Sequence, residues 1–173
     1  MATDTAVRKS ETKSAKSTKP ASTGPDAIVM LREDHKRVDA LFKEYEKSKD
    51  TMSDAEKVSL AKEICAELTV HAMLEEELFY PAARGALAED GEELLDEAEV
   101  EHDTAKDLIA WIESAAADTP LFDAKVKVLG EYIKHHVEEE HDEMFPKCRK
   151  SSMDLKAIGA QMQERKAELV GKA

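Results

Sequence analysis

The sequence predicts an all-α protein, an antiparallel up-down four-helix bundle with an additional C-terminal helix. Apolar residues recur at intervals of three and four positions in five segments, which is the spacing of one buried face of an α-helix. The 173 residues include only six glycines and five prolines, so long segments are free of turn-forming residues. A His-x-x-x-Glu motif followed by a proline occurs twice, 65 residues apart, which indicates two similar helical hairpins.

Start and stop signals divide this pattern into helices. A capping box that begins at Ser53 predicts the start of the second helix. Thr119-Pro120 predicts the start of the fourth, because proline suits the first helical position. Pro81 and Pro146 are expected to end the second and fourth helices. The four expected bundle helices span residues 26–49, 53–81, 90–116 and 119–145.

The two ends of the chain differ from the bundle. Residues 1–25 are rich in Ala, Ser, Thr and Lys and have almost nothing apolar to bury, which predicts a disordered tail. Residues 149–173 predict a last, more polar helix, capped by Ser151 or Ser152 and packed on or beside the bundle. The bundle itself is expected to comprise residues 26–148.

Polar residues interrupt the apolar stripes of all four bundle helices. On the second helix, His71 and Glu75 stand one turn apart, where the spacing of the leucines calls for apolar residues. The fourth helix repeats this arrangement, and the first and third helices each place one histidine on the stripe. The six inward-facing polar residues are His35, His71, Glu75, His102, His136 and Glu140.

Burial of these six side chains in one core favours a metal site. Two unpaired buried carboxylates would each cost several kcal/mol, and the same stripes offer no lysine or arginine to pair with them. Four neutral imidazoles and two carboxylates can instead supply two metal ions, with the carboxylates available as bridges. Mixed nitrogen and oxygen ligands suit iron or manganese, whereas zinc more often takes fewer ligands in a tetrahedral site.

Other polar and aromatic residues are assigned to less specific roles. His135 and His141 lie off the stripe and are interpreted as non-ligands. The sequence predicts a mostly solvated acidic face, some of which could contact the histidine N–H groups, formed by Glu76, Glu77, Glu138, Glu139, Asp142 and Glu143. The aromatic residues interpreted as core or interface groups rather than catalytic ones are Tyr45, Tyr80, Trp111 and Tyr132.

The charge and the cysteines limit the classes of partner and compartment. The formal net charge of −13 disfavours nucleic acid and anionic membranes as partners. No apolar run is long enough to cross a membrane, and the N-terminus has no secretory h-region. Cys65 and Cys148 stand in no zinc-like or redox-like spacing and are expected to be reduced. We therefore expect a cytoplasmic protein, for which a homodimer is compatible with the sequence.

These motifs resemble the hemerythrin family, in its HHE cation-binding branch. The resemblance covers about residues 26–148 and is carried by Asp34-His35, Glu101-His102 and the two His-x-x-x-Glu motifs with their Phe-Tyr-Pro and Phe-Pro continuations. It implies an antiparallel four-helix bundle around a non-haem di-iron centre, with an oxo or hydroxo bridge. It further implies terminal ligation by the four histidines and bridging by Glu75 and Glu140, with manganese or zinc as alternative metals.

The third helix departs from the pattern of the oxygen-carrying members, which have two histidines one turn apart there. In this chain the neighbouring positions are Lys106 and Ala98, and Glu140 stands where the carriers often have aspartate. Fewer imidazoles should leave more exchangeable metal positions. The preferred hypothesis is a protein that binds dioxygen, nitric oxide or peroxide in sensing, storage or stress response. The alternatives are a catalase-like or ferroxidase-like di-iron enzyme, and a helical interaction module with incidental histidines.

Overall fold

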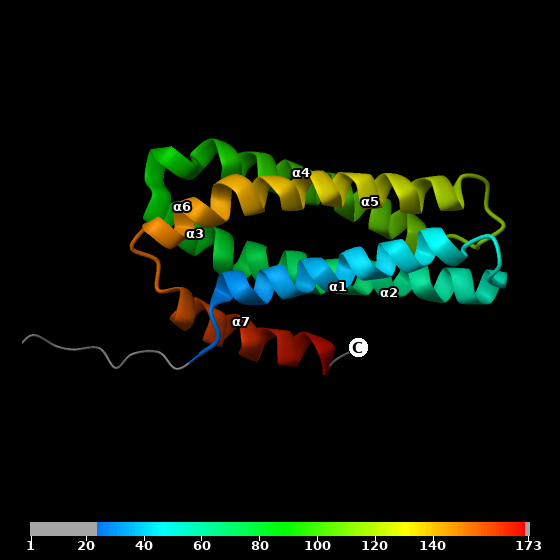
Figure 1. Cartoon of the computed structure of the whole chain (residues 1–173), viewed down its shortest axis with the longest axis horizontal. Coiled ribbons are helices and arrows are strands. Elements are labelled where there is room, and N and C mark those ends of the chain that lie inside the picture. Colours follow the sequence, from blue (N-terminus) through cyan, green and yellow to red (C-terminus); the bar gives the residue numbers. More distant parts are fainter. Residues whose placement is uncertain (1–23, 172–173) are drawn as a thin grey trace, which may run out of the picture.

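The computed structural model describes residues 24–171 and consists of two helical hairpins packed face to face (Figure 1). One hairpin is formed by α1 (Ala27–Ser48) and α2 (Asp54–Leu74), and the other by α4 (Glu92–Ser114) and α5 (Phe122–Glu139). Every regular element within residues 24–171 is helical. The predicted antiparallel four-helix bundle is confirmed.

Two of the bundle helices continue beyond their expected ends through a π-helical turn. After α2 the chain passes through η1 (Glu75–Phe79) into α3 (Tyr80–Leu87), and the short 3₁₀ helix η2 (Ala88–Gly91) then leads into α4. After α5 it passes through η3 (Glu140–Met144) into α6 (Phe145–Lys150). The two π turns occupy equivalent places in the two hairpins.

The prediction that helices end near Pro81 and Pro146 is wrong. In a regular α-helix, a proline ring clashes with the carbonyl four residues earlier and leaves it without a donor. Here the residue before each proline donates its N–H to the carbonyl of the glutamate five residues back. The wider π turn therefore carries the helix past the proline, so that each proline opens a further helical segment.

The expected helix starts have mixed outcomes. The capping box is confirmed, because Ser53 and Glu56 each accept a backbone hydrogen bond from the other. The predicted start at Thr119-Pro120 is wrong. The Thr119 carbonyl accepts the N–H of Phe122 at 3.1 Å, which closes a turn, and α5 begins only at Phe122.

The predicted cap of the last helix is also wrong. The helix α7 (Leu155–Val170) is capped by Asp154, whose side chain accepts the N–H of Ala157 at 3.0 Å. The Ser151 hydroxyl donates instead to the carbonyl of Cys148, so this residue ends α6. Asp154 is as suitable a capping residue as Ser151, and because it is the one used, α7 begins later than expected.

The core consists of two apolar clusters on either side of a buried polar layer. One cluster surrounds Phe79 and Phe145, at the end of the bundle where α3 and α6 lie. The other surrounds Phe122 and Leu129, toward the opposite end. Along each bundle helix the histidine separates residues of the first cluster from residues of the second. Apolar packing on both sides therefore holds the polar layer in place.

The helix α7 covers only one hairpin. It packs against α1 and α2, on the side away from α4 and α5 (Figure 1). Met162 is fully buried in the interface, and a Cβ at Gly159 would lie 2.0 Å from the carbonyl oxygen of Pro25. Only glycine therefore permits this close approach.

Two other predictions from the sequence concern the N-terminal tail and membrane-spanning helices. Residues 1–23 of the expected tail lie outside the described residues. In the part of the chain that the structure describes, no helix combines the length and apolar character needed to span a bilayer.

Candidate metal centre

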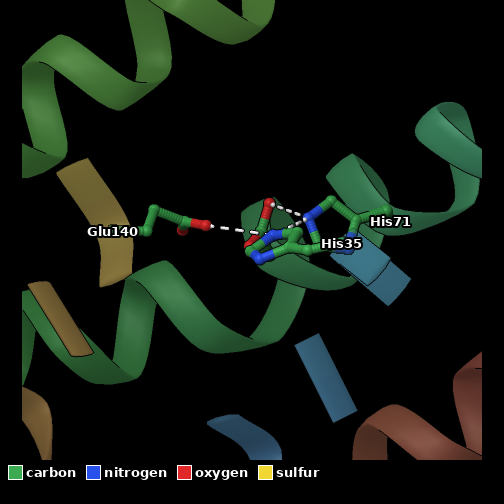
Figure 2. A group of neighbouring side chains, drawn as sticks. His35, His71 and Glu140 are labelled. Atoms are coloured by element: carbon green, nitrogen blue, oxygen red, sulfur yellow. Dashed lines mark hydrogen bonds and ion pairs between the residues drawn. The ribbon is translucent and has the colours of Figure 1, made fainter. Parts of the chain in front are cut away.

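The six polar residues that the sequence singled out lie together in the middle of the bundle. The histidines come from the four long helices, and the glutamates are the first residues of η1 and η3. Each of the six is at most 7% exposed. Figure 2 shows the imidazoles of His35 and His71 pointing toward each other, with the carboxylate of Glu140 directed at them.

His35 and His71 form what we call the first half of the centre. Their Nε2 atoms lie 2.9 Å apart. Glu140 Oε2 lies 3.2 Å from His35 Nε2, and Glu75 Oε2 lies 3.2 Å from His71 Nε2. These two histidines and two glutamates each offer one donor atom, and the four atoms all lie within 4.8 Å of one another.

His102 and His136 form the second half, in which donor atoms of these two residues and of Glu75 all lie within 4.8 Å of one another. Their Nε2 atoms lie 3.2 Å apart. Glu75 Oε2 is 3.4 Å from His102 Nε2, and Glu140 Oε2 is 3.8 Å from His136 Nε2. Each carboxylate therefore reaches one imidazole of each half. This is the position that a bridging ligand would occupy.

The two π turns place these carboxylates. In each hairpin the glutamate lies four residues after its histidine and begins the turn. Single π turns within α-helices occur frequently at functional sites, where the widened backbone redirects a side chain. Both copies of the motif thus adopt the same backbone geometry. In each, the histidine lies one turn before the π turn, the glutamate begins it and the proline follows it.

The donor set fits divalent cations. Among the described residues, Glu75 Oε1, Glu75 Oε2 and Glu140 Oε2 are buried polar atoms without a hydrogen-bond partner. Buried polar atoms are otherwise almost always satisfied. Paired imidazole nitrogens face these oxygens, and the resulting set of nitrogen and oxygen donors is one that iron, manganese or zinc accepts.

The electrostatics favour positive charge in the cluster. Burial lowers the pKa of His71, but Glu75, Asp34 and Glu140 outweigh it and raise that pKa to about 10. For Glu75, burial acts to raise the pKa, while His71 and His102 hold it well below its usual value. Burial likewise lowers the pKa of His136, and Glu101 and Glu140 raise it to about 8. Metal ions would compete with protons for these nitrogens.

Each histidine has an outer partner that faces its Nδ1 atom. His102 and His136 donate to Glu76 and Glu101, both at 2.7 Å. These contacts leave each Nε2 free to bind a metal. Among the acidic residues predicted as a solvated face, Glu76 is thus a partner of the centre. Glu101 was noted only as part of a motif, and its position directly before His102 was the available signal.

The first half has different outer partners. His35 Nδ1 contacts His141 Nε2 at 2.9 Å, and His71 Nδ1 lies 3.8 Å from Asp34 Oδ2, too far for a hydrogen bond. Asp34 is in turn paired with Lys166 of α7. His141, predicted as a non-ligand, therefore contacts one of the six residues from outside the cluster.

Tyr80, expected from the sequence to be a core or interface aromatic residue, lies at the centre. Its hydroxyl donates to Glu140 Oε1 at 3.1 Å and lies 3.2 Å from His102 Nε2. Burial and the charges of Glu140 and Glu75 raise its pKa well above the usual value, so the phenol keeps its proton. The signal was the repeat, in which Tyr80 stands at the position of Phe145 in the other hairpin.

A small cavity adjoins the centre. It has a volume of about 140 Å³ and is lined by the four histidines together with apolar residues. A wider groove of about 440 Å³ lies between α1 and α5, and the two share His35, Val38, Ile133 and Val137 as lining residues. The groove on the surface therefore adjoins the inner cavity at these four residues.

Comparison with known proteins places these features in a family. The sequence matches the family described as Hemerythrin HHE cation binding domain over residues 26–148. A curated protein named DNA nickase, from Nostoc sp. (strain PCC 7120), is 30% identical over 146 residues, which cover 79% of this chain and 40% of that protein. This chain thus spans less than half the length of that relative.

A solved structure has a similar fold. The crystal structure of a hemerythrin HHE cation binding domain-containing protein from Mycobacterium kansasii aligns with a TM-score of 0.71. The alignment covers 86% of this chain and 89% of that chain, at 22% sequence identity. At this identity the likeness establishes the fold, while the character of the site depends on the residues of this chain.

Proposed function

The chain belongs to the hemerythrin HHE cation-binding family, and on that premise we propose that it holds two iron ions between its four buried histidines, bridged by Glu75 and Glu140. We further propose that the pair binds dioxygen, nitric oxide or peroxide in sensing, storage or stress response. Manganese and zinc are the alternative metals. The two free, buried cysteines support a reducing compartment, the cytoplasm, as its location.

One observation carries the proposal of a metal pair. Glu75 Oε2 lies within 3.4 Å of an Nε2 atom from each half, and Glu140 Oε2 lies within 3.8 Å of the other two Nε2 atoms. Two carboxylates that each reach both halves would hold two metal ions more readily than one. An iron pair would supply a redox-active position for a small ligand.

The surroundings of the centre support a small, uncharged ligand. The adjoining cavity is lined mainly by apolar side chains, which favour a neutral diatomic molecule over a hydrated ion. Lys106, one turn after His102, pairs with Glu76 at 2.8 Å and so provides no inner donor. Fewer imidazoles on α4 leave a position open to an external ligand.

Metal analysis tests the proposal. We expect protein purified after iron supplementation to contain a paired iron centre, with near-ultraviolet charge-transfer absorption that changes when azide or nitric oxide is added. Glu75→Gln should abolish this spectrum. The matched variant Glu138→Gln, which alters an exposed glutamate on α5, should leave it unchanged. Iron-supplemented protein without the spectrum would contradict the proposal.

Tyr80 favours one alternative, an enzyme that removes hydrogen peroxide. Its buried phenol, which keeps its proton, lies 3.1 Å from Glu140 and could donate a hydrogen bond to a peroxide bound in the centre. Ferrous oxidation at the same centre is a related activity. Oxygen evolution from peroxide distinguishes an enzyme from a binding protein. Turnover above that of free iron, lost in Glu75→Ala, would support the enzyme.

The activity in the name of the Nostoc relative belongs to that protein, of which this chain covers only 40%. The net charge of −13 opposes binding to a phosphate backbone. We therefore do not extend the activity to this chain.

A further inference from the structure

The helix α5 carries two interleaved His-x-x-x-Glu pairs that face in different directions. His136 and Glu140 point into the centre, where both are buried. His135 and Glu139, each one residue earlier, point toward the surface, with 60% and 30% of their side chains exposed. The outer pair thus has the same one-turn spacing as the inner pair, with imidazole and carboxylate 3.3 Å apart.

Glu101 of α4 lies between the two pairs. It is only 6% exposed, and its Oε2 accepts the hydrogen bond of His136 Nδ1 at 2.7 Å. Its Oε1 is directed the other way, toward His135 Nε2 at 3.9 Å. That distance is too long for a hydrogen bond, so Oε1 of Glu101 faces the outer pair with His135 as its nearest ion-pair partner among the described residues.

The equivalent carboxylate of the other hairpin has a cationic partner. Asp34 precedes His35 as Glu101 precedes His102, and it forms an ion pair with Lys166 of α7. The helix α7 packs on α1 and α2, so it provides no such lysine for Glu101 (Figure 1). Within residues 24–171, the ion-pair partners of Glu101 are histidines alone.

We propose that Glu101, His135 and Glu139 bind a divalent metal ion at a third position, outside the buried centre. One donor atom from each residue lies within 4.8 Å of the others. The exposed side chains of His135 and Glu139 can move the short distance needed to reach bonds of about 2.0–2.2 Å. One imidazole and two carboxylates are donors that Mn²⁺, Fe²⁺ and Zn²⁺ all accept.

The third position is coupled to the centre through Glu101. A cation on Oε1 would draw negative charge from Oε2, which accepts the hydrogen bond of His136. It would thus do for Glu101 what Lys166 does for Asp34, and would lower the donor strength of one imidazole in the second half. Occupancy of the outer site should therefore be detectable at the inner one.

Zinc stoichiometry tests this inference. We expect the full-length protein, saturated with Zn²⁺ by equilibrium dialysis, to bind one ion more than the variants Glu139→Gln and His135→Asn. The matched variant Glu138→Gln removes the same charge from an exposed neighbour on α5 and should bind as many ions as the parent. Equal stoichiometry in the parent and in both outer-site variants would overturn the inference.

One further variant distinguishes failure of the outer site from failure of the proposed function. His71→Ala should lose metal from the centre yet retain the Glu139-dependent ion, because the outer donors come from α4 and α5 alone. Circular dichroism and thermal melting confirm that each variant is folded. If the centre holds no metal but the Glu139-dependent ion remains, the proposed function fails while the outer site stands.

Discussion

The two halves of the candidate centre have the same inner donors but different surroundings. In each half, two Nε2 atoms face carboxylates that are shared with the other half. Behind the second half, both Nδ1 atoms donate to carboxylates at 2.7 Å. Behind the first half, one Nδ1 atom contacts another imidazole at 2.9 Å, and the other has a carboxylate only at 3.8 Å.

This difference shows that the repeat preserves the inner histidines and glutamates but not the residues that contact their Nδ1 atoms. At equivalent places in the two hairpins, Glu76 corresponds to His141 and Tyr80 corresponds to Phe145. A carboxylate behind an imidazole increases its donor strength, whereas a neutral imidazole does so less. We therefore expect the second half to hold a metal ion more tightly than the first.

The largest expected effect is on the pH dependence of the metal-free protein. The pKa values of His71 and His136, about 10 and about 8, lie above the ordinary value of about 6.5. The stabilisation they give is fully present below pH 6.5 and is lost as the pH rises through the folded values. Urea unfolding of chelator-treated protein should show a loss on the order of a few kcal/mol between pH 6.5 and 10.

Variants assign this loss to the two halves. Between pH 6.5 and 8 both histidines contribute to the loss, so His136→Asn should reduce the slope of stability against pH there without removing it. His71→Asn should reduce the slope over the whole range from pH 6.5 to 10. A stability that is constant across the whole range would refute the assignment of raised pKa values to either histidine.

The second prediction compares the outer carboxylates. Glu101→Gln should weaken metal binding in the second half by about 10–100-fold, the usual cost of losing such a partner. Asp34→Asn should cost less, because Asp34 stands 3.8 Å from its histidine and is paired with Lys166. Competition with a chelator of known affinity measures both. A larger effect of Asp34→Asn would reverse the proposed order of the halves.

The third prediction exchanges the non-equivalent partners. Glu76→His should make the second half resemble the first and weaken its metal binding by several-fold, which is up to about 1 kcal/mol. His141→Glu should strengthen the first half by a similar amount. Shifts in the same direction from both variants, measured by the same chelator competition, would count against the comparison.

The fourth prediction concerns the aromatic pair, Tyr80 and Phe145. Tyr80→Phe removes the hydrogen bond to Glu140 and should lower the free energy of unfolding by about 1 kcal/mol. Phe145→Tyr introduces a hydroxyl beside His35, where the ring is fully buried, and should destabilise by roughly 1–3 kcal/mol unless a partner is found. Denaturant unfolding measures both. An unchanged stability in Tyr80→Phe would mean that the phenol contributes nothing to holding Glu140.

The sequence predicted the bundle and the gathering of the six inner residues because both follow from periodicity. His71 and Glu75 stand where a leucine stripe demands apolar side chains, so their inward direction was readable. The continuation of the helices past Pro81 and Pro146 was not predicted, because proline usually ends a helix and the motif alone does not distinguish a π turn from a helix end.

The outer partners were beyond periodicity as well. These partners lie off the apolar stripe, on the polar side of their helices among other acidic residues: Glu76, Glu101 and His141. Only the crossing of neighbouring helices decides which of them meets an Nδ1 atom. The place of Tyr80 in the centre was not predicted, because a tyrosine in a helix core is commonly structural. The partner of its hydroxyl, Glu140, belongs to the other hairpin.

Anomalous diffraction from crystals of the iron-loaded protein tests the central claim most directly. We predict two strong iron peaks about 3.5–4 Å apart, one at His35 and His71 and the other at His102 and His136, both in contact with Glu75 and Glu140. A single peak, or peaks that leave either glutamate uncoordinated, would contradict a centre built from two halves and joined by two carboxylates.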